Sequence, residues 1–249
     1  MSFAVAAELS IIVPVFNEAE NILPLAREIA AILAAGAQKY ELVFVDDCST
    51  DKTWENIRAA NQEDPRVRGL RLARNSGQSA ALWTGIQATG GPVIATLDGD
   101  LQNDPAELPR MLAELSRCDF VCGMRVERQD NFVRRASSRV ARWARKTVLG
   151  ADFRDTGCAL RVFKRATVAG LFGFNGLHRF LPVLVQNGGF STKEIPVRHR
   201  PRVAGVSKYG VWNRLGRGIV DLFAIAWYQR RRTRPVPFTE WPAPADGRP

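Results

Sequence analysis

The apolar stretch Pro92-Val93-Ile94-Ala95-Thr96-Leu97 runs directly into Asp98-Gly99-Asp100-Leu101-Gln102. A short apolar run bounded by turn-forming residues is typical of a buried strand, so two carboxylates and an amide follow the carboxyl end of that strand. Such oxygen ligands suit a hard divalent cation, Mg²⁺ or Mn²⁺, which keeps positions open for phosphates. Because Asp and Gly also form ordinary turns, the motif by itself more often marks an exposed acidic loop, and the surrounding pattern has to decide.

Strand-like and helix-like segments alternate from residue 9 to residue 124. We expect strands at 9–15, 41–46, 67–72, 92–97 and 120–124, separated by helices at 17–33, 51–60, 79–88 and 105–115. This alternation predicts an α/β fold, with a mostly parallel sheet and helices on both faces. Ligands of such sheets bind at the carboxyl ends of the strands. Polar clusters fall at four of those ends: Asn17-Glu18, Asp46-Asp47, Arg74-Asn75 and the run from Asp98 to Gln102.

The pattern changes after residue 125. We expect a basic amphipathic helix at 132–149, which is either solvated on its charged side or an interfacial helix or lid over phosphates. A strand-like segment follows at 192–198. A last amphipathic helix is expected at 213–228, and Arg230-Arg231-Arg232 comes directly after it.

Composition narrows the choice of partner. The 249 residues carry a formal net charge of +10, which makes nucleic acid, anionic lipid and nucleotide phosphates the candidates. The first 65 residues are not basic and no nucleic-acid-binding module is recognisable, which argues against nucleic acid. The sequence contains no run of about twenty apolar residues, so we expect no transmembrane helix. We also expect no secretory signal. Four cysteines without zinc spacing or a disulfide framework fit a reducing cytoplasm.

Four motifs follow one another along the first part of the chain. They are Pro14-Val15-Phe16-Asn17-Glu18, Asp46-Asp47-Cys48-Ser49-Thr50-Asp51, Asn75-Ser76-Gly77-Gln78-Ser79-Ala80-Ala81 and Asp98-Gly99-Asp100-Leu101-Gln102. In this order and spacing they resemble inverting family 2 glycosyltransferases of the GT-A fold. The closer resemblance is to the polyprenyl-phosphate group, that is, dolichyl-phosphate mannosyltransferases and bacterial undecaprenyl-phosphate glycosyltransferases. Three later motifs extend it: Asp155-Thr156-Gly157-Cys158, His178-Arg179-Phe180-Leu181-Pro182 and Gly205-Val206-Ser207-Lys208-Tyr209-Gly210.

The resemblance covers residues 9–228. It implies a Rossmann-like GT-A sheet with flanking helices, followed by C-terminal amphipathic helices, and a donor site for a UDP- or GDP-sugar. The residues it assigns are Pro14, Asn17 and Glu18 at the nucleoside, Asp46 and Asp47 at the diphosphate, and Asn75 beside the nucleotide. Simpler roles remain open, because Glu18 could be the carboxylate at a helix N-terminus and Asp47 or Ser49 could cap the next helix.

The implied catalytic residues are Asp100, Arg125 and Asp155, and the implied metal ligands are Asp98, Asp100 and Gln102. The Mg²⁺ or Mn²⁺ of these enzymes neutralises charge on the leaving nucleotide. Arg125 could clamp phosphate or sugar bidentately, or be a surface arginine. Asp155 lies where related enzymes carry an acidic residue near the acceptor and the donor sugar. Since a phosphate acceptor is already an anion at neutral pH, Asp155 would orient the sugar or a basic residue, unless it only forms a turn.

A basic loop near the C-terminus completes the expected site. The residues that the resemblance assigns to the diphosphate and the lipid phosphate are Arg200, Arg202, Ser207 and Lys208, with Arg134 and Arg135 as further candidates. A solvated charge run is the simpler interpretation of this segment. His178 is more consistent with the start of a helix than with a catalyst.

We expect a catalytic domain at 1–211, an amphipathic helix with a basic tail at 212–234, and a disordered Pro-rich tail at 235–249. The helix would either lie at a membrane interface or pack on the domain. The expected function is inverting transfer of one sugar from a nucleotide sugar to undecaprenyl or dolichyl phosphate, by a peripheral protein at the cytoplasmic face of the membrane. The alternatives are a glycosyltransferase with a soluble, protein or polysaccharide acceptor, and a nonenzymatic nucleotide-sugar sensor. A homo-oligomer or an integral membrane partner is also considered.

Overall fold

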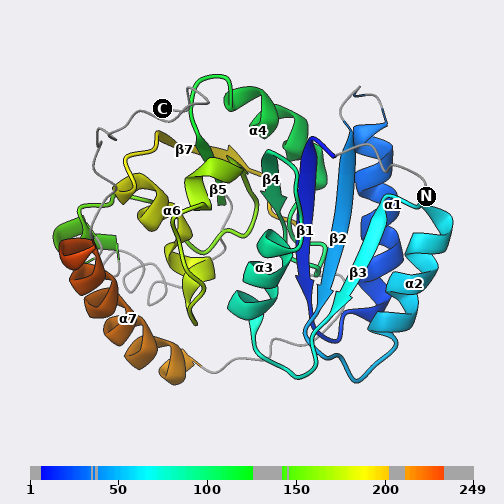
Figure 1. Ribbon diagram of the computed structural model, residues 1–249, viewed down its shortest axis with the longest axis horizontal. Coiled ribbons are helices and arrows are strands. Elements are labelled where there is room, and N and C mark those ends of the chain that lie inside the picture. The colour runs from blue at the N-terminus through cyan, green and yellow to red at the C-terminus, as the bar shows by residue number, and fades with distance from the viewer. Residues whose placement is uncertain are drawn as a thin grey trace, which may run out of the picture.

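The computed structural model describes residues 7–34, 36, 39–125, 142–144, 146–201 and 211–232, and for 211–219 it describes the backbone alone. Seven strands form one sheet in the order β3-β2-β1-β4-β6-β5-β7 (Figure 1). The strands are β1 (Leu9–Val15), β2 (Tyr40–Asp46), β3 (Val67–Arg71), β4 (Val93–Thr96), β5 (Phe120–Arg125), β6 (Arg161–Lys164) and β7 (Thr192–Val197). Within this sheet, only β6 runs antiparallel to its neighbours. The expected α/β fold with a mostly parallel sheet is therefore confirmed.

Helices cover both faces of the sheet. Those with complete bounds are α1 (Ala19–Leu33), α2 (Thr53–Glu63), α3 (Gln78–Gln87), α4 (Leu108–Glu114), α6 (Leu177–Asn187) and α7 (Val211–Arg231), with 3₁₀ turns η1 (Pro105–Glu107) and η2 (Arg165–Val168). Of the helix expected at 132–149, residues 142–144 and 146–149 are helical, and the rest lies outside the described residues. Ile11 and Val13 of β1 pack in one apolar layer with α1, α2 and α4, whereas Ile12 packs in the other with α3, α6 and α7. This alternation is the period-two pattern of a strand buried on both faces.

The expected strands are all found, with ends shifted by at most one residue. β6 was not expected. It has only four residues, two of them charged, so it is too short to show a periodic pattern. It inserts between β4 and β5, where Arg161 pairs with Thr96 on one side and with Cys122 on the other. β6 thereby carries residues from the second half of the chain to the centre of the sheet.

Helix α7 is longer than the expected 213–228 and has two different sides. Ile225 and Ala226 are buried against the layer that contains α3 and α6. Val220, Phe223 and Trp227 are 68%, 63% and 65% exposed. The helix therefore packs on the domain and still presents an apolar stripe to solvent. No helix in the described part of the chain has the length and apolar character needed to span a bilayer.

Candidate active site

Backbone strain gathers at the carboxyl edge of the sheet. Among the described residues, the non-glycine positions with positive φ are Asn17 (53°), Cys48 (61°) and Leu101 (61°). They follow β1, β2 and β4 respectively. A left-handed conformation costs an L-residue roughly 1–2 kcal/mol, and such strain clusters at functional sites. The strain therefore marks the same edge as the polar clusters of the sequence.

The Asp98–Gln102 loop is built tightly onto the end of β1. A Cβ atom at Gly99 would lie 2.5 Å from Cγ1 of Val15, so glycine is needed between the two aspartates. The Asp98 amide donates to Oδ1 of Asn103 at 2.9 Å, and the Gln102 amide donates to Oδ1 of Asp100 at 3.2 Å. These contacts place both carboxylates in one loop, with Asp100 only 7% exposed.

The donor set of this loop fits a hard divalent cation. Asp98 and Asp100 supply carboxylate oxygens and Gln102 an amide oxygen, which are the ligands that Mg²⁺ and Mn²⁺ prefer. The described part of the chain contains no cluster of three or more His, Cys, Asp or Glu side chains arranged for a metal. The residues of this loop that would hold such a cation are Asp98, Asp100 and Gln102.

Asp46 and Asp47 organise the neighbouring loops. The Asp46 carboxylate is fully buried, with Oδ1 accepting from the Ser49 amide at 2.9 Å and Oδ2 lying 3.2 Å from Nε of Arg71. Asp47 accepts from the amides of Ser76 at 2.7 Å and Gly77 at 2.8 Å. Asp47 therefore anchors the loop before α3.

No side chain caps α2. The N-cap position is Lys52, so the expected cap by Asp47 or Ser49 is wrong. Asp51, one residue before the cap position, accepts from the Thr53 amide at 2.9 Å. Ser49 instead accepts from the Asn17 amide at 2.9 Å.

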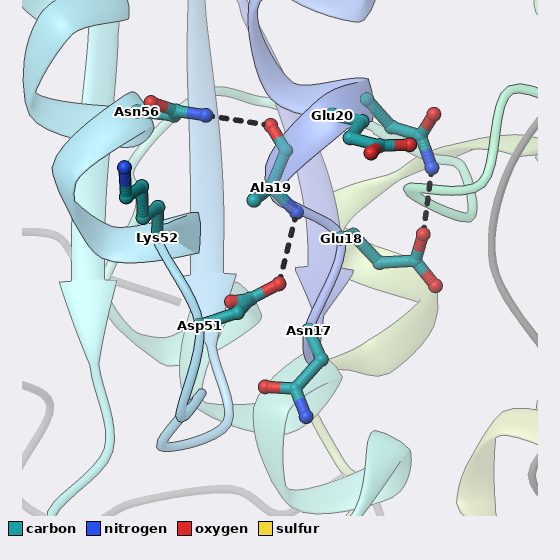
Figure 2. Close-up of a pocket in the computed structure, with 8 residues that line it drawn as sticks. Asn17, Glu18, Ala19, Glu20, Asp51, Lys52 and Asn56 are labelled. Carbon is teal, nitrogen blue, oxygen red and sulfur yellow. Dashed lines mark hydrogen bonds between the residues drawn. The ribbon is translucent and has the colours of Figure 1, made fainter.

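The first loop is joined to the second by side chains. Oδ1 of Asn17 accepts from the Thr50 amide at 2.8 Å, and the Glu18 carboxylate accepts from Nδ2 of Asn21 at 2.7 Å. Glu18 directly precedes α1, as its simpler role implies. Figure 2 shows Asp51 and Asn56 reaching the main chain of Ala19 beside a pocket of about 500 Å³. Its lining residues are Asn17, Glu18, Ala19, Glu20, Asn21, Asp51, Lys52 and Asn56.

Pro14 and Asn75 contact neighbouring strands and loops at this edge. Pro14 pairs with Val45 but lies beyond Ile12, the last residue of β1 that pairs with β4, so no ladder bond to β4 is lost at the proline. Nδ2 of Asn75 donates to the carbonyl of Asp47 at 3.1 Å. Both residues support the loops at the carboxyl edge.

Arg125 and Asp155 form a bidentate ion pair. Nε and Nη2 of Arg125 donate to the Asp155 carboxylate at 2.7 and 2.8 Å, and the two side chains are 15% and 8% exposed. Burial lowers the pKa of Arg125, but the hydrogen bonds and charge of Asp155 outweigh it and raise that pKa above its ordinary value, with a smaller contribution from the charge of Asp98. Arg125 is thus no surface arginine, and Asp155 orients a basic residue.

Three further residues of this network were given no role by the sequence. Nε2 of Gln78 donates to Oδ1 of Asp98 at 2.8 Å, linking the start of α3 to the acidic loop. Glu194 of β7 accepts from the amides of Arg154 and Asp155 at 2.9 and 3.0 Å. Ser79 lies within 2.6 Å of Nδ1 of His178 and accepts from the Gly176 amide at 2.9 Å. His178 is the second residue of α6, as expected. Contacts between residues so far apart in the sequence produce no periodic pattern along the chain.

Arg200 is bound within the protein. Its guanidinium donates to Glu28 at 2.7 and 3.0 Å and to Asp104 at 2.6 Å. Its amide also donates to the carbonyl of Gln102 at 2.9 Å, so Arg200 fastens the chain after β7 to the acidic loop. The other expected basic-loop residues, Arg134, Arg135, Arg202, Ser207 and Lys208, lie outside the described residues.

Solved structures share this fold. A mannosyltransferase from Pyrobaculum calidifontis, in complex with GDP-Man and Mn²⁺, matches with a TM-score of 0.64 and 20% identity over 93% of this chain and 66% of that chain. A glucosyl-3-phosphoglycerate synthase from Mycobacterium tuberculosis, in complex with Mn²⁺, uridine diphosphate and phosphoglyceric acid, matches with a TM-score of 0.65 and 20% identity over 90% and 78% of the two chains. The fold is thus that of GT-A glycosyltransferases.

The sequence then identifies the family. The Glycosyl transferase family 2 model matches residues 10–168, and the chain belongs to this family. It is 38% identical to a dodecaprenyl-phosphate galacturonate synthase of Rhizobium johnstonii, over 93% of this chain and 70% of the relative. It is 35% identical to an undecaprenyl-phosphate 4-deoxy-4-formamido-L-arabinose transferase of Edwardsiella ictaluri, over 82% of this chain and 63% of that relative. The chain therefore spans just under two thirds of the length of the second relative.

Proposed function

We propose that this protein transfers one sugar, with inversion, from a nucleotide sugar to a polyprenyl phosphate. The observation that carries the proposal is the juxtaposition, at one strained edge of the sheet, of the acidic Asp98–Gln102 loop with the Arg125–Asp155 pair. The relatives named for dodecaprenyl- and undecaprenyl-phosphate support the acceptor class. The fold neighbours with Mn²⁺ and a nucleotide support the donor class.

On the donor side, Asp98, Asp100 and Gln102 would hold the cation. When bound, a divalent cation supplies positive charge that stabilises the leaving diphosphate. Gly99 lets this loop lie against the end of β1, so the carboxylates are fixed before the donor binds. The loops around Asn17, Glu18 and Asp47 lie at the same edge and would receive the nucleoside and its diphosphate.

On the acceptor side, the phosphate needs orientation more than deprotonation. A phosphate monoester is anionic at neutral pH, so the acceptor oxygen can attack the sugar carbon while the bond to the diphosphate breaks. Asp155 occupies Nε and Nη2 of Arg125, which leaves Nη1 to donate to a phosphate or sugar oxygen. Preorganised donors of this kind stabilise developing charge without reorganisation during the reaction. Arg202, Ser207 and Lys208 are proposed to meet the lipid phosphate.

We also propose that the protein works peripherally at a membrane surface, on its cytoplasmic face. The exposed stripe of Val220, Phe223 and Trp227 would insert among lipids, and the exposed Arg230 and Arg231 would contact anionic head groups. Each basic residue near an anionic leaflet contributes about 1 kcal/mol, and salt screens that contribution.

Vesicle flotation separates the two contributions. Phe223→Ser with Trp227→Ser should reduce flotation with anionic vesicles at both low and high salt. Arg230→Gln with Arg231→Gln should reduce it at low salt alone. Wild-type flotation by all variants would exclude this helix as the membrane contact.

The reaction is tested by a matrix of donors and acceptors. UDP-, GDP- and dTDP-sugars are combined with undecaprenyl phosphate, dolichyl phosphate or a soluble phosphate acceptor, with Mn²⁺, Mg²⁺ or excess EDTA. We expect cation-dependent formation of a polyprenyl-phosphate sugar. Transfer to the soluble acceptor alone would refute the lipid acceptor, and undiminished turnover in EDTA would refute the metal loop.

A further inference from the structure

Arg161 is a buried arginine beneath the candidate site. It is the first residue of β6 and is only 2% exposed. Its Nη2 donates to the carbonyl of Thr156 at 2.9 Å, while its Nε has no hydrogen-bond partner among the described residues. Side chains of arginine are almost never buried in this way unless they are paired.

The surroundings of Arg161 do not neutralise it. Its neighbours include the thiols of Cys122 and Cys158, and burial raises the pKa of both, that of Cys158 to about 11, so both thiols are uncharged. Within the described residues, no carboxylate forms an ion pair with Arg161. Burying an unpaired charge costs free energy. The contact that Arg161 makes in return is its hydrogen bond to the Thr156 carbonyl.

Thr156 belongs to the turn that orients Arg125. The side chain of Asp155 accepts from Arg125 and from the Gly157 amide at 3.2 Å. Arg161 holds the carbonyl of the residue between them. Arg161 therefore holds the turn at residues 155–157 through the Thr156 carbonyl, and Arg125 holds it through the Asp155 carboxylate.

Arg165, the first residue after the other end of β6, is an example of a purely structural arginine. Its guanidinium donates to the carbonyls of Gly91 at 2.7 Å and Ile86 at 2.8 Å, and to the Thr89 hydroxyl at 2.9 Å. Gly91 precedes β4, so these contacts lie at the amino edge, away from the candidate site. Both arginines hold main-chain carbonyls, and they differ in which edge of the sheet they serve.

We propose that Arg161 is a positioning residue for the transfer reaction. By holding Thr156, it keeps the Asp155 carboxylate in register with Arg125, and so fixes the direction in which the Arg125 guanidinium meets the substrate. The role deepens the proposed function, because it assigns the support of the Arg125 clamp. A merely structural Arg161 would stabilise the fold without affecting turnover.

The test compares Arg161→Met, Arg161→Lys and the matched control Arg165→Met, each assayed well below its thermal midpoint. Arg161→Met should lower kcat at least tenfold with the donor KM changed less than threefold. Arg161→Lys should recover part of kcat, because an ammonium can still donate to the Thr156 carbonyl. Arg165→Met should lower the thermal midpoint and leave kcat within twofold. Wild-type kcat in Arg161→Met, or equal kcat losses in both methionine variants, would overturn the proposal.

A double-mutant comparison identifies the route of the effect. If Arg161 acts through Asp155, Arg161→Met should lower kcat less than twofold in an Asp155→Asn background. Full additivity of the two losses would contradict this route. The assay can use whichever acceptor the donor and acceptor matrix identifies, so failure with polyprenyl phosphate would refute the proposed function and leave the Arg161 result interpretable. If no acceptor supports transfer, urea unfolding is measured for the wild type, Arg161→Met, Asp155→Asn and the double variant. Additive shifts of the unfolding midpoint would then overturn the coupling between Arg161 and Asp155.

Discussion

The two edges of the sheet are both polar, but within the described residues only the carboxyl edge holds non-glycine residues with positive φ. At the amino edge, the fully buried Ser10 donates to Glu41 at 2.7 Å and accepts from the Gly91 amide at 3.1 Å. Among the described residues, all three non-glycine positions with positive φ lie in loops at the carboxyl edge. A closed network without strain is what stability requires, whereas strain persists where the surroundings impose it for another purpose. We therefore expect substitutions at the two edges to have separable effects on turnover and on stability.

The largest separation is expected at Asp100. Asp100→Asn keeps the shape of the side chain and removes its charge, so kcat should fall on the order of 10² to 10³, as for the loss of one strong electrostatic stabiliser. The matched control is Asp119→Asn at the amino edge, where Lys164 and Ser191 hold the pKa of the carboxyl at about 2. The control should retain wild-type kcat in the sugar-transfer assay. Equal losses of kcat in the two variants would contradict a functional difference between the two edges of the sheet.

A smaller loss of turnover is expected for Arg125→Lys. Lysine keeps the positive charge but cannot form the bidentate pair with Asp155 and still present a donor in a fixed direction. We expect kcat to fall roughly tenfold to a hundredfold, with a lower thermal midpoint because the buried bidentate pair with Asp155 is weakened. Donor affinity, measured by calorimetry, distinguishes binding from orientation. A rise in donor KM with an unchanged kcat would show that Arg125 contributes uniform binding instead.

Most of the sheet could be predicted from the sequence, because long apolar periods define β1 and its parallel neighbours. The polar clusters also lie, as expected, at one edge of the sheet, since the carboxyl ends of parallel strands meet there. β6 could not be predicted, because four residues carry no measurable period and its position depends on pairing with β4 and β5. The burial of Arg161 could not be predicted either, because Arg161 belongs to β6.

The sequence proposes the residues of the candidate site but does not show their contacts. Asp47 anchors the loop before α3 because the Ser76 and Gly77 amides meet it in space, and no spacing along the chain signals that contact. The orientation of α7 was also open, since Phe223 and Ala226 both fit an apolar period and only packing shows which is buried.

Ser10→Ala tests the amino edge. The substitution removes a hydroxyl that satisfies the buried Gly91 amide, so the free energy of unfolding should fall by about 1–3 kcal/mol. Thermal unfolding should report a midpoint lower by about 2–4 °C per kcal/mol, with kcat within twofold of wild type. Ser116→Ala serves as the control, because Ser116 is exposed and, among the described residues, its hydroxyl bonds only to the Ala113 carbonyl. A large loss of turnover in Ser10→Ala would mean that the amino edge also supports catalysis.

The smallest effect is expected at Cys48, which occupies the same place after β2 that Asn17 occupies after β1. Each lies two residues beyond its strand in the left-handed region, at φ values of 61° and 53°. Asparagine tolerates this conformation better than other residues with a side chain, so Cys48→Asn should raise the free energy of unfolding by up to about 1 kcal/mol. Cys48→Ala removes the thiol and keeps the strain, and it should not raise the thermal midpoint. If the two variants melt together, relief of strain does not explain the change. If Cys48→Asn is more stable but slower in the transfer assay, the strain after β2 contributes to turnover, and the contrast between the two edges extends from the acidic loop to the loop that precedes α2.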